Sequence, residues 1–411
     1  MKKTQLNKRK IVNDPVYGLI NMPSEIIYDI IEHKYFQRLR RIKQLGLTDY
    51  VYPGAVHTRF QHTLGAVHLI SSAITVLRSK GTSITYEEEE AVSLAILLHD
   101  IGHGPYSHTL EHIIVEKYSH EELSLQYMNA LNNEYNGKLN LAIKIFQNQY
   151  QKKFLHQLVS SQLDVDRLDY LRRDSFYTGV SEGVIGSDRI IKMLAVVNDE
   201  LVIEAKGIYS VEKFLIARWL MYWQVYLHKT VVSAEMLLLK IFKRVKFLIS
   251  ENKEVYLTKE LKYFFTNPQI GNSDLITILN NFSAIDDTDI LVLIKNWAKS
   301  NDKVLSELSN KLINRQLFKI EIQDEPFDQK KISELSEKAS KLLNLNKSEV
   351  QYYVFTDHIS KNAYSAFDDK IRILYKDGSL KDVGDASDIL NTAMLSKTVR
   401  KYFLCYPKEI I

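Results

Sequence analysis

The sequence predicts a mainly α-helical protein, with a small hairpin in its helical core and a smaller C-terminal domain of mixed α and β structure. Apolar residues recur at helical spacing through most of the first 250 residues. From about residue 251 the composition shifts toward Asn, Asp, Ser and Lys, and the segments 317–322, 351–355 and 371–375 alternate like strands. We therefore expect two domains, residues 1–250 and residues 251–411.

Composition narrows the classes of protein to consider. The chain has 411 residues, 45% of them hydrophobic and 25% charged, as is usual for a globular protein. The net charge of +4 argues against broad nucleic-acid binding. A single cysteine, Cys405, excludes an intrachain disulfide and a cysteine-based zinc site, and fits a reducing, cytoplasmic setting. No apolar run approaches the ~20 residues of a membrane span, so no membrane partner is expected.

The N-terminal elements follow from turn and cap signals. Residues 1–12 form a basic arm, and turns at 13–18 favour a short hairpin. Pro23, Ser24 and Glu25 are typical of a helix start. A second helix is predicted over 36–46, with an apolar stripe and several Arg and Lys residues on its other faces. That basic side is either a solvated face or a face directed at phosphate.

Further helices are predicted in order along the chain. They cover 57–79, 87–98, 119–131, 154–163 and 210–250. Glu87 to Glu90 suit the start of their helix because acids are favourable near the positive end of the helix dipole. Asn198 and Asp199 predict the turn of a hairpin over 196–206.

The most unusual stretch is 97–108, in which two ionisable residues, His99 and Asp100, directly follow a buried apolar helix. Ionisable groups at the end of a buried run are costly unless something pairs with them. A divalent metal would compensate, because neutral imidazole and carboxylate are both good ligands. His103 lies four residues after His99, so the two imidazoles share a face if the helix continues. Gly102, Gly104 and Pro105 would then end the helix.

Other residues could complete such a site. Eight of the twelve histidines fall between residues 57 and 120. Taken singly, His57, His68 and His112 are best interpreted as surface or core histidines. A metal held by two histidines and two aspartates, with positions left for water and phosphate, is ordinary coordination chemistry. The sequence offers His62, His99, Asp100 and a later aspartate.

The order of His62, then His99 and Asp100, then Asp166 resembles the HD-domain metal-dependent phosphohydrolases. Further matching motifs lie at 36–40, 53–55, 59–65, 99–108, 164–170 and 226–229. Together they look like the deoxynucleoside triphosphate triphosphohydrolase branch, including the catalytic core of the animal SAM-and-HD-domain enzyme. The resemblance covers roughly residues 10 to 245, and it includes no SAM domain. It implies an HD-domain helical core.

The resemblance also implies a metal centre and catalytic groups. It places one divalent transition metal, Mn, Fe, Zn or Ni with Mg less favoured, on His62, His99, Asp100 and Asp166. It implies catalytic roles for His103, His120, Glu111 and Arg59. The two histidines would lie near the α-phosphate, Glu111 would be coupled to one of them, and Arg59 would contact the triphosphate.

Substrate contacts are implied by the same resemblance. The matching residues are Gln44, His108, Arg167, Tyr170, Asp174, Arg218 and Tyr226. Of these, Gln44 and Asp174 match groups that bind the sugar 3′-hydroxyl, and Tyr226 matches an aromatic that crowds the 2′ position. The others match triphosphate contacts. The implied reaction is attack of water at the α-phosphorus, which releases a deoxynucleoside and inorganic triphosphate.

A nucleotide effector site is implied as well. Lys10, Gln37 and Arg40 resemble residues of an effector site between subunits of a homo-oligomer, a dimer or tetramer, and Glu32 corresponds to the acid that reads guanine. The alternative is a basic helix face packed at a subunit interface.

Two other functions remain open. One is an HD-type phosphatase or phosphodiesterase that acts on another nucleotide, because HD sites share their ligands across these activities. The other is a regulatory protein that senses nucleotides. Gln44, Asp174 and Tyr226 favour a deoxynucleotide substrate, and the intact ligand set with both accessory histidines argues against an inactive site.

Overall fold

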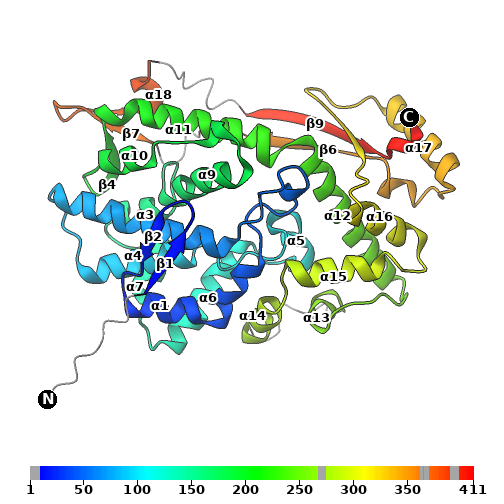
Figure 1. Ribbon diagram of the computed structural model, residues 1–411, viewed down its shortest axis with the longest axis horizontal. Helices are drawn as coiled ribbons and strands as arrows, with labels where there is room; N and C mark the ends of the chain where they lie inside the picture. Colours follow the sequence, from blue (N-terminus) through cyan, green and yellow to red (C-terminus); the bar gives the residue numbers. More distant parts are fainter. Residues whose placement is uncertain (1–9, 267–274, 362–363, 365–369, 389–397) are drawn as a thin grey trace.

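Helices make up most of the chain that the computed structural model describes, namely residues 10–266, 275–361, 364, 370–388 and 398–411 (Figure 1). The prediction of a mainly α protein is confirmed. The predicted basic arm lies outside the described residues up to position 9. The α-helices are α1 Glu25–Glu32, α2 Lys34–Gln37, α3 Arg59–Ser79, α4 Tyr86–Leu98, α5 Glu111–Ile114, α6 His120–Glu134, α7 Asn140–Phe146, α8 Lys153–Val159, α9 Val165–Thr178, α10 Ser187–Met193, α11 Ile208–Met221, α12 Lys229–Ser250, α13 Lys259–Thr266, α14 Leu275–Ser283, α15 Asp287–Trp297, α16 Lys303–Ile313, α17 Gln329–Leu343 and α18 Val383–Ala386.

Shorter helices and small sheets complete the described fold. The 3₁₀ turns are η1 Arg38–Arg41, η2 Thr48–Tyr50, η3 Ser107–Thr109, η4 Ser181–Gly183, η5 Ala205–Gly207, η8 Val350–Tyr352 and η9 Lys408–Ile410, and η6 Tyr222–Tyr226 is a π-helix. The strands are β1 Ile11–Asp14, β2 Gly18–Asn21, β3 Leu194–Val197, β4 Glu200–Glu204, β5 Lys319–Gln323, β6 Phe355–Lys361, β7 Arg372–Leu374, β8 Leu380–Asp382 and β9 Val399–Tyr406.

Both predicted hairpins are present. In the first, β1 and β2 pair antiparallel with Asp14 opposite Gly18, and this hairpin lies near α3 and α9 (Figure 1). In the second, β3 and β4 pair across a turn of Asn198 and Asp199, whose φ angles of 52° and 61° are those of a tight hairpin turn. Local turn chemistry was therefore enough to locate them.

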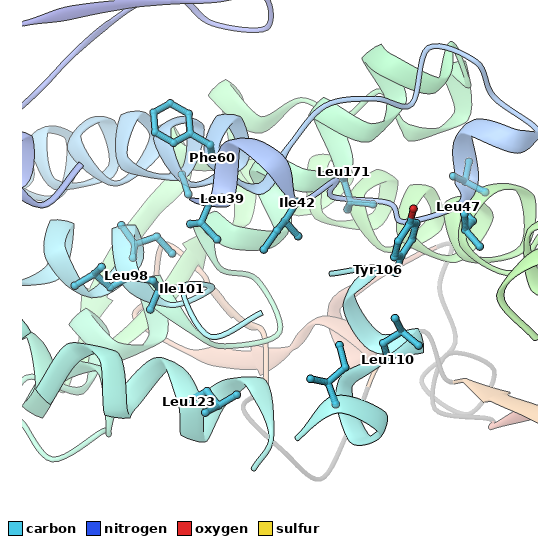
Figure 2. Close-up of a cluster of buried hydrophobic side chains, with 14 of the residues drawn as sticks. Leu39, Ile42, Leu47, Phe60, Leu98, Ile101, Tyr106, Leu110, Leu123 and Leu171 are labelled. Atoms are coloured by element: carbon cyan, nitrogen blue, oxygen red, sulfur yellow. The ribbon is translucent and has the colours of Figure 1, made fainter. Parts of the chain in front are cut away.

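Helix α3 is the central helix of the N-terminal core. By length and composition it could span a membrane, but 67% of its most apolar window is buried inside the protein, as in a core helix. It packs between α4 and α9. Figure 2 shows Leu98 and Ile101 in the buried cluster that also contains Leu39 and Ile42. Because Leu98 and Ile101 are fully buried, His99 and Asp100 between them are held in a fixed position.

The helix predicted over 36–46 is much shorter than expected. Helix α2 and the turn η1 end at Arg41, and Ile42 is extended. The helix ends here because a residue far away in the sequence binds its backbone. The backbone N–H of Lys43 donates to Asp287 Oδ2 over 2.9 Å. The predicted basic face is also only partly solvated, because Arg38 is buried and donates to the carbonyls of Ile101 and His103.

Two other predicted helices are interrupted. The helix expected over 154–163 ends at Val159, because Asp164 instead caps α9 by accepting from the N–H of Arg167. The region expected over 210–250 is divided by η6 and a turn at Leu227, and His228 Nδ1 accepts from the N–H of Thr230 to begin α12. Tyr226 therefore stands at a break in the helix, where π-turns redirect side chains.

The C-terminal part contains the expected mixture of helices and strands. One sheet has the order β5-β9-β6 and another β3-β4-β7-β8, in which β4 and β7 are parallel. The strand predicted over 351–355 is wrong, since η8 occupies that segment and β6 begins only at Phe355. Helix α12 ends at Ser250, yet the second sheet joins strands from both sides of that residue. The division into two domains stays a prediction.

Candidate metal centre and histidine cluster

The four predicted metal ligands converge from three helices. His62 lies in the first turn of α3, His99 and Asp100 follow α4, and Asp166 lies in the first turn of α9. The Nε2 atom of His62 is 3.1 Å from Asp166 Oδ1 and 3.7 Å from Asp100 Oδ2. The Nε2 atom of His99 is 3.4 Å from the nearest oxygen of each aspartate. The site is therefore built by packing helices rather than by one flexible loop.

The donor set fits a divalent metal. The Nε2 atoms of His62 and His99 are buried and have no hydrogen-bond partner among the described residues. Each of these atoms lies within 4.8 Å of the other and of a carboxylate oxygen of Asp166, as ligands of one ion would. Two imidazoles with carboxylates suit Mn, Fe, Zn or Ni better than Mg.

Each of the two candidate ligand histidines is oriented through its other nitrogen. His62 Nδ1 is 2.7 Å from Asp169 Oδ2, and His99 Nδ1 is 2.6 Å from the carbonyl oxygen of Ile96. These partners require protons on Nδ1 and leave Nε2 free for a metal. The role of Asp169 was not predicted from the sequence. Its position three residues after Asp166 on a helix was an available signal, since such residues share a face.

Metal uptake is expected to release protons. Burial lowers the pKa of His62, but the carboxylates of Asp166 and Asp169 raise it more, to about 10. The pKa of His99 is also raised, because Asp100 and Asp166 outweigh burial. Protein stripped with a chelator therefore carries a proton on His62 at neutral pH that a metal must displace. Affinity should rise with pH, about tenfold per pH unit for each proton released.

Titration calorimetry in buffers of different ionisation enthalpy will count these protons. A dissociation constant for Mn²⁺ that does not change between about pH 6 and pH 8 would contradict the assignment of His62 as a ligand.

Beside the metal centre lies a second group of side chains, the histidine cluster, formed by His103, His108, His120 and Glu111. The rings of His103 and His120 stack with centroids 3.9 Å apart. Glu111 Oε1 lies 2.6 Å from His120 Nδ1, and Oε2 lies 2.9 Å from His108 Nδ1. One glutamate therefore orients two imidazoles. The three imidazoles are also close enough together to hold an ion.

The histidine cluster joins the metal centre through His103. Its Nε2 atom is 3.3 Å from Asp100 Oδ1. Burial and Arg59 lower the pKa of His103 well below its usual value, so this imidazole is neutral near pH 7. Hydrogen bonds from His108 and His120 outweigh burial and lower the pKa of Glu111, which stays ionised.

The backbone after His99 differs from the continued helix that was considered. Helix α4 ends at Leu98, and Tyr106 and Ser107 have left-handed φ angles of 51° and 46°. Arg59 ties this turn to the metal centre, because it pairs with Asp100 Oδ2 and donates to Ser107 Oγ over 2.7 Å. His103 thus faces the centre from a loop, and not from the same helical face as His99.

The residues matched to the sugar contacts also come together. Tyr226 donates to Asp174 Oδ2 over 2.7 Å, and His57 Nε2 lies 2.7 Å from Asp174 Oδ1. The carbonyl of His57 accepts from the N–H of Gln44 at 3.0 Å. His57 therefore holds both Gln44 and Asp174, although the sequence suggested only a structural role. Its pairing with Asp174 spans 117 residues, so no local pattern could indicate it.

The predicted triphosphate contacts lie around α9 and α11. Arg167 pairs with Asp164, and Arg218 is nearly buried and donates weakly to Gln162 Oε1 at 3.5 Å. Burial raises the pKa of Tyr170, and both arginines oppose that shift, so they lie within electrostatic range of its hydroxyl. The Nε atoms of both arginines are buried without a partner among the described residues. His108, at 71% side-chain exposure, is open to solvent.

The residues matched to an effector site make contacts within this chain. Lys10 contacts Tyr28, while Gln37 Oε1 accepts from Arg40 Nε at 2.9 Å. The Arg40 guanidinium also lies 3.6 Å from the ring centroid of Phe60. Glu32 is exposed nearby. A nucleotide effector site stays a prediction.

Comparison with known protein families matches two adjoining regions. Residues 59–174 match the HD domain, and residues 185–257 match the HD associated region. The first match begins at Arg59 and ends at Asp174, so it contains all four converging ligands and the histidine cluster.

Individual relatives extend this similarity, two of them over nearly the whole chain. A crystal structure of a phosphohydrolase from Bacteroides thetaiotaomicron is 56% identical, with a TM-score of 0.93 over 97% of this chain and 100% of that one. The uncharacterized protein YwfO of Bacillus subtilis is 31% identical over 99% of this chain and 94% of its own length. The deoxynucleoside triphosphate triphosphohydrolase SAMHD1 homolog of Dictyostelium discoideum is 31% identical over 57% of this chain and 48% of its own length.

Proposed function

The chain belongs to the HD-domain phosphohydrolase family, and we propose that it hydrolyses deoxynucleoside triphosphates to deoxynucleoside and inorganic triphosphate. The observation that carries the proposal is the position of the histidine cluster, whose His103 lies 3.3 Å from the metal-site residue Asp100. A phosphoryl group bound at the centre can thus meet a proton donor on its other side. Similarity to the Dictyostelium enzyme supports the choice of substrate.

The chain supplies two kinds of group to this reaction. A divalent ion held by His62, His99, Asp100 and Asp166 would make water more acidic and polarise a phosphoryl oxygen. Arg167 and Arg218 offer positive charge to the rest of the triphosphate, each with a buried Nε that lacks a partner among the described residues. Such fixed charges stabilise the transition state without reorganising.

The histidine cluster donates the proton that the leaving group needs. When the bond from the α-phosphorus to the sugar 5′-oxygen breaks, that oxygen needs a proton to leave as a hydroxyl. We assign this role to His120, whose Nδ1 is held by Glu111 and whose ring stacks on His103. Glu111 is ionised, accepts from His120 Nδ1 and so holds this imidazole in a fixed orientation.

The pocket for the sugar gives the proposal its preference for deoxynucleotides. Tyr226 is anchored on Asp174 and lies with its ring centroid 6.3 Å from that of Tyr170. Because this hydrogen bond holds the Tyr226 ring in place, the ring would crowd a ribose 2′-hydroxyl bound beside it.

Replacing Tyr226 with alanine is expected to relax this preference. The ratio of kcat/KM for a dNTP to that for the matching NTP should fall by about tenfold, because the aromatic obstacle and the anchor on Asp174 are both lost. Steady-state kinetics with paired nucleotides will measure the ratio. Tyr209→Ala is the control, since Tyr209 is exposed on α11. An unchanged ratio in Tyr226→Ala would remove Tyr226 from the sugar pocket.

A panel of nucleotides tests the proposed function itself. Purified protein with Mn²⁺ is offered dNTPs, NTPs, nucleoside monophosphates and cyclic dinucleotides, each with and without a second dNTP as an effector. Turnover confined to dNTPs supports the proposal. Orthophosphate release from monophosphates, or cleavage of cyclic dinucleotides alone, would show that the chain is another kind of HD phosphohydrolase. Tight dNTP binding without turnover would indicate a nucleotide sensor.

A further inference from the structure

We propose that Asp14, the last residue of β1 in the N-terminal hairpin, is a positioning residue for the metal centre and acts on His62 through Arg173 and Asp169. These four side chains form a continuous series of contacts, named here the buried polar chain. The inference rests on the metal binding in the proposed function, but it makes no assumption about the nucleotide.

The buried polar chain is continuous at hydrogen-bond distance. Asp14 Oδ2 accepts from Arg173 Nη1 over 2.7 Å. The Nε and Nη2 atoms of Arg173 then donate to the two oxygens of Asp169 over 2.9 and 3.0 Å. Asp169 Oδ2 lies 2.7 Å from His62 Nδ1, and the opposite nitrogen of His62 faces the metal centre. Two side chains, Arg173 and Asp169, therefore link the hairpin to the proposed metal ligand His62.

Almost no solvent reaches these groups. The side chains of His62, Asp169 and Arg173 are 0% exposed, and that of Asp14 is 4% exposed. Buried charges are stable only when they are paired, so each group depends on its neighbours. Both oxygens of the Asp169 carboxylate accept from Arg173, and one of them also lies beside His62 Nδ1. An ionised Asp169 keeps the proton of His62 on Nδ1 and makes Nε2 a better donor to a metal.

Arg173 is held between two carboxylates. Burial lowers its pKa, but Asp169 and Asp14 together raise it. Without Asp14, the guanidinium would keep one carboxylate partner, and its Nη1 donor would be unsatisfied in the interior. The Arg173 side chain would then change its position. Asp169 would move with it, because two parallel hydrogen bonds join the two groups.

The packing around the buried polar chain is adapted to it. Gly65 lies on α3 one turn after His62, where a Cβ atom would be 2.0 Å from Asp169 Oδ1 and 2.2 Å from Arg173 Nη2. Glycine at this position lets the ion pair on α9 approach α3. On the other side, the ring of Tyr17 from the hairpin lies 5.6 Å from the Arg173 guanidinium. Figure 1 shows the hairpin close to α3. The hairpin therefore covers the Asp14 end of the buried polar chain.

The substitution Asp14→Asn separates the contact of Asp14 with Arg173 from the hydrogen bonds that Asp14 accepts within the hairpin turn. Asp14 Oδ1 accepts from the N–H groups of Val16 and Tyr17 over 2.9 and 3.0 Å, and an asparagine oxygen can accept the same two bonds. Its amide group would then face Arg173 Nη1, which is also a donor. The variant should keep the hairpin and lose the link to Arg173.

The test measures metal binding directly. Full-length protein is stripped with a chelator and titrated with Mn²⁺ at neutral pH, and the visible spectrum of the Co²⁺-loaded protein reports the ligand geometry. We expect Asp14→Asn to bind Mn²⁺ about tenfold more weakly and to change the Co²⁺ spectrum, as outer partners of metal ligands typically do. Asp188→Asn is the matched control, because Asp188 is exposed and pairs with the neighbouring Arg172 at 3.5 Å.

The outcomes are distinct. Equal dissociation constants and spectra for Asp14→Asn and the wild type would overturn the inference and leave the proposed function standing. A wild type that binds no metal would overturn both. If Asp14→Asn is unfolded by circular dichroism, the same criteria apply to Arg173→Lys, which keeps the charge but cannot contact Asp14 and both oxygens of Asp169 together.

Discussion

Asp166→Ala protein is expected to hydrolyse its nucleotide at least about 10³-fold more slowly than the wild type and to bind much less metal. Asp166 Oδ1 is the oxygen that lies within 3.4 Å of both ligand imidazoles. Removing it takes away an anionic ligand and leaves His62 and His99 facing each other with one fewer carboxylate. Losing the stabilisation that a metal gives to a phosphoryl transition state costs several kcal/mol, which corresponds to this loss of rate.

The measurement for Asp166→Ala combines kcat with metal content by mass spectrometry. Asp29→Ala, at an exposed position of α1, is the matched control and should keep full activity and metal. Melting curves recorded with a chelator will show that both variants are folded. Full turnover and full metal content in Asp166→Ala would show that another group is the fourth ligand.

His120→Gln is expected to reduce kcat by about 10²- to 10⁴-fold, the usual contribution of a general acid. The glutamine amide can still donate to Glu111, so the local structure should survive, but it cannot deliver a proton to the 5′-oxygen. Metal affinity at the centre formed by His62, His99, Asp100 and Asp166 should be nearly unchanged, because His120 contacts Glu111 and His103 and not these four residues.

A lower kcat with unchanged metal affinity would distinguish a proton donor from a metal ligand. His112→Gln is the control, because His112 is exposed on α5 beside the cluster. A substrate with a better leaving group than the 5′-alkoxide, such as a nitrophenyl ester of triphosphate, should recover much of the activity lost in His120→Gln. An equal loss with both substrates would remove His120 from the leaving-group step.

Much of the fold, and a group of residues near His99 that could hold a metal, could be predicted from the sequence because the signals are local. An apolar run that ends in His99 and Asp100 predicts both a buried helix and a cost that a metal can offset. The hairpin turns at 13–18 and 198–199 could also be predicted from local sequence. The resemblance to HD-domain enzymes then supplied His62 and Asp166, which spacing alone does not select.

The features that were missed depend on partners far away in the chain. The helix expected over 36–46 is shorter because the backbone N–H of Lys43 donates to Asp287, 244 residues away. His57 was interpreted as structural because Asp174, its partner, lies 117 residues later. Strand β9, Val399–Tyr406, lies between β5 and β6 and was not predicted, because its apolar residues acquire a partner only in the folded sheet.

The central claim is that water attacks the α-phosphorus of a deoxynucleoside triphosphate, and the distribution of an oxygen isotope among the products tests it most directly. The reaction is run with Mn²⁺ in ¹⁸O-labelled water, and the products are separated and weighed by mass spectrometry. The account predicts unlabelled deoxynucleoside and inorganic triphosphate that carries one ¹⁸O atom. Deoxynucleoside monophosphate with pyrophosphate, released orthophosphate, or label in the 5′-hydroxyl of the deoxynucleoside would contradict it.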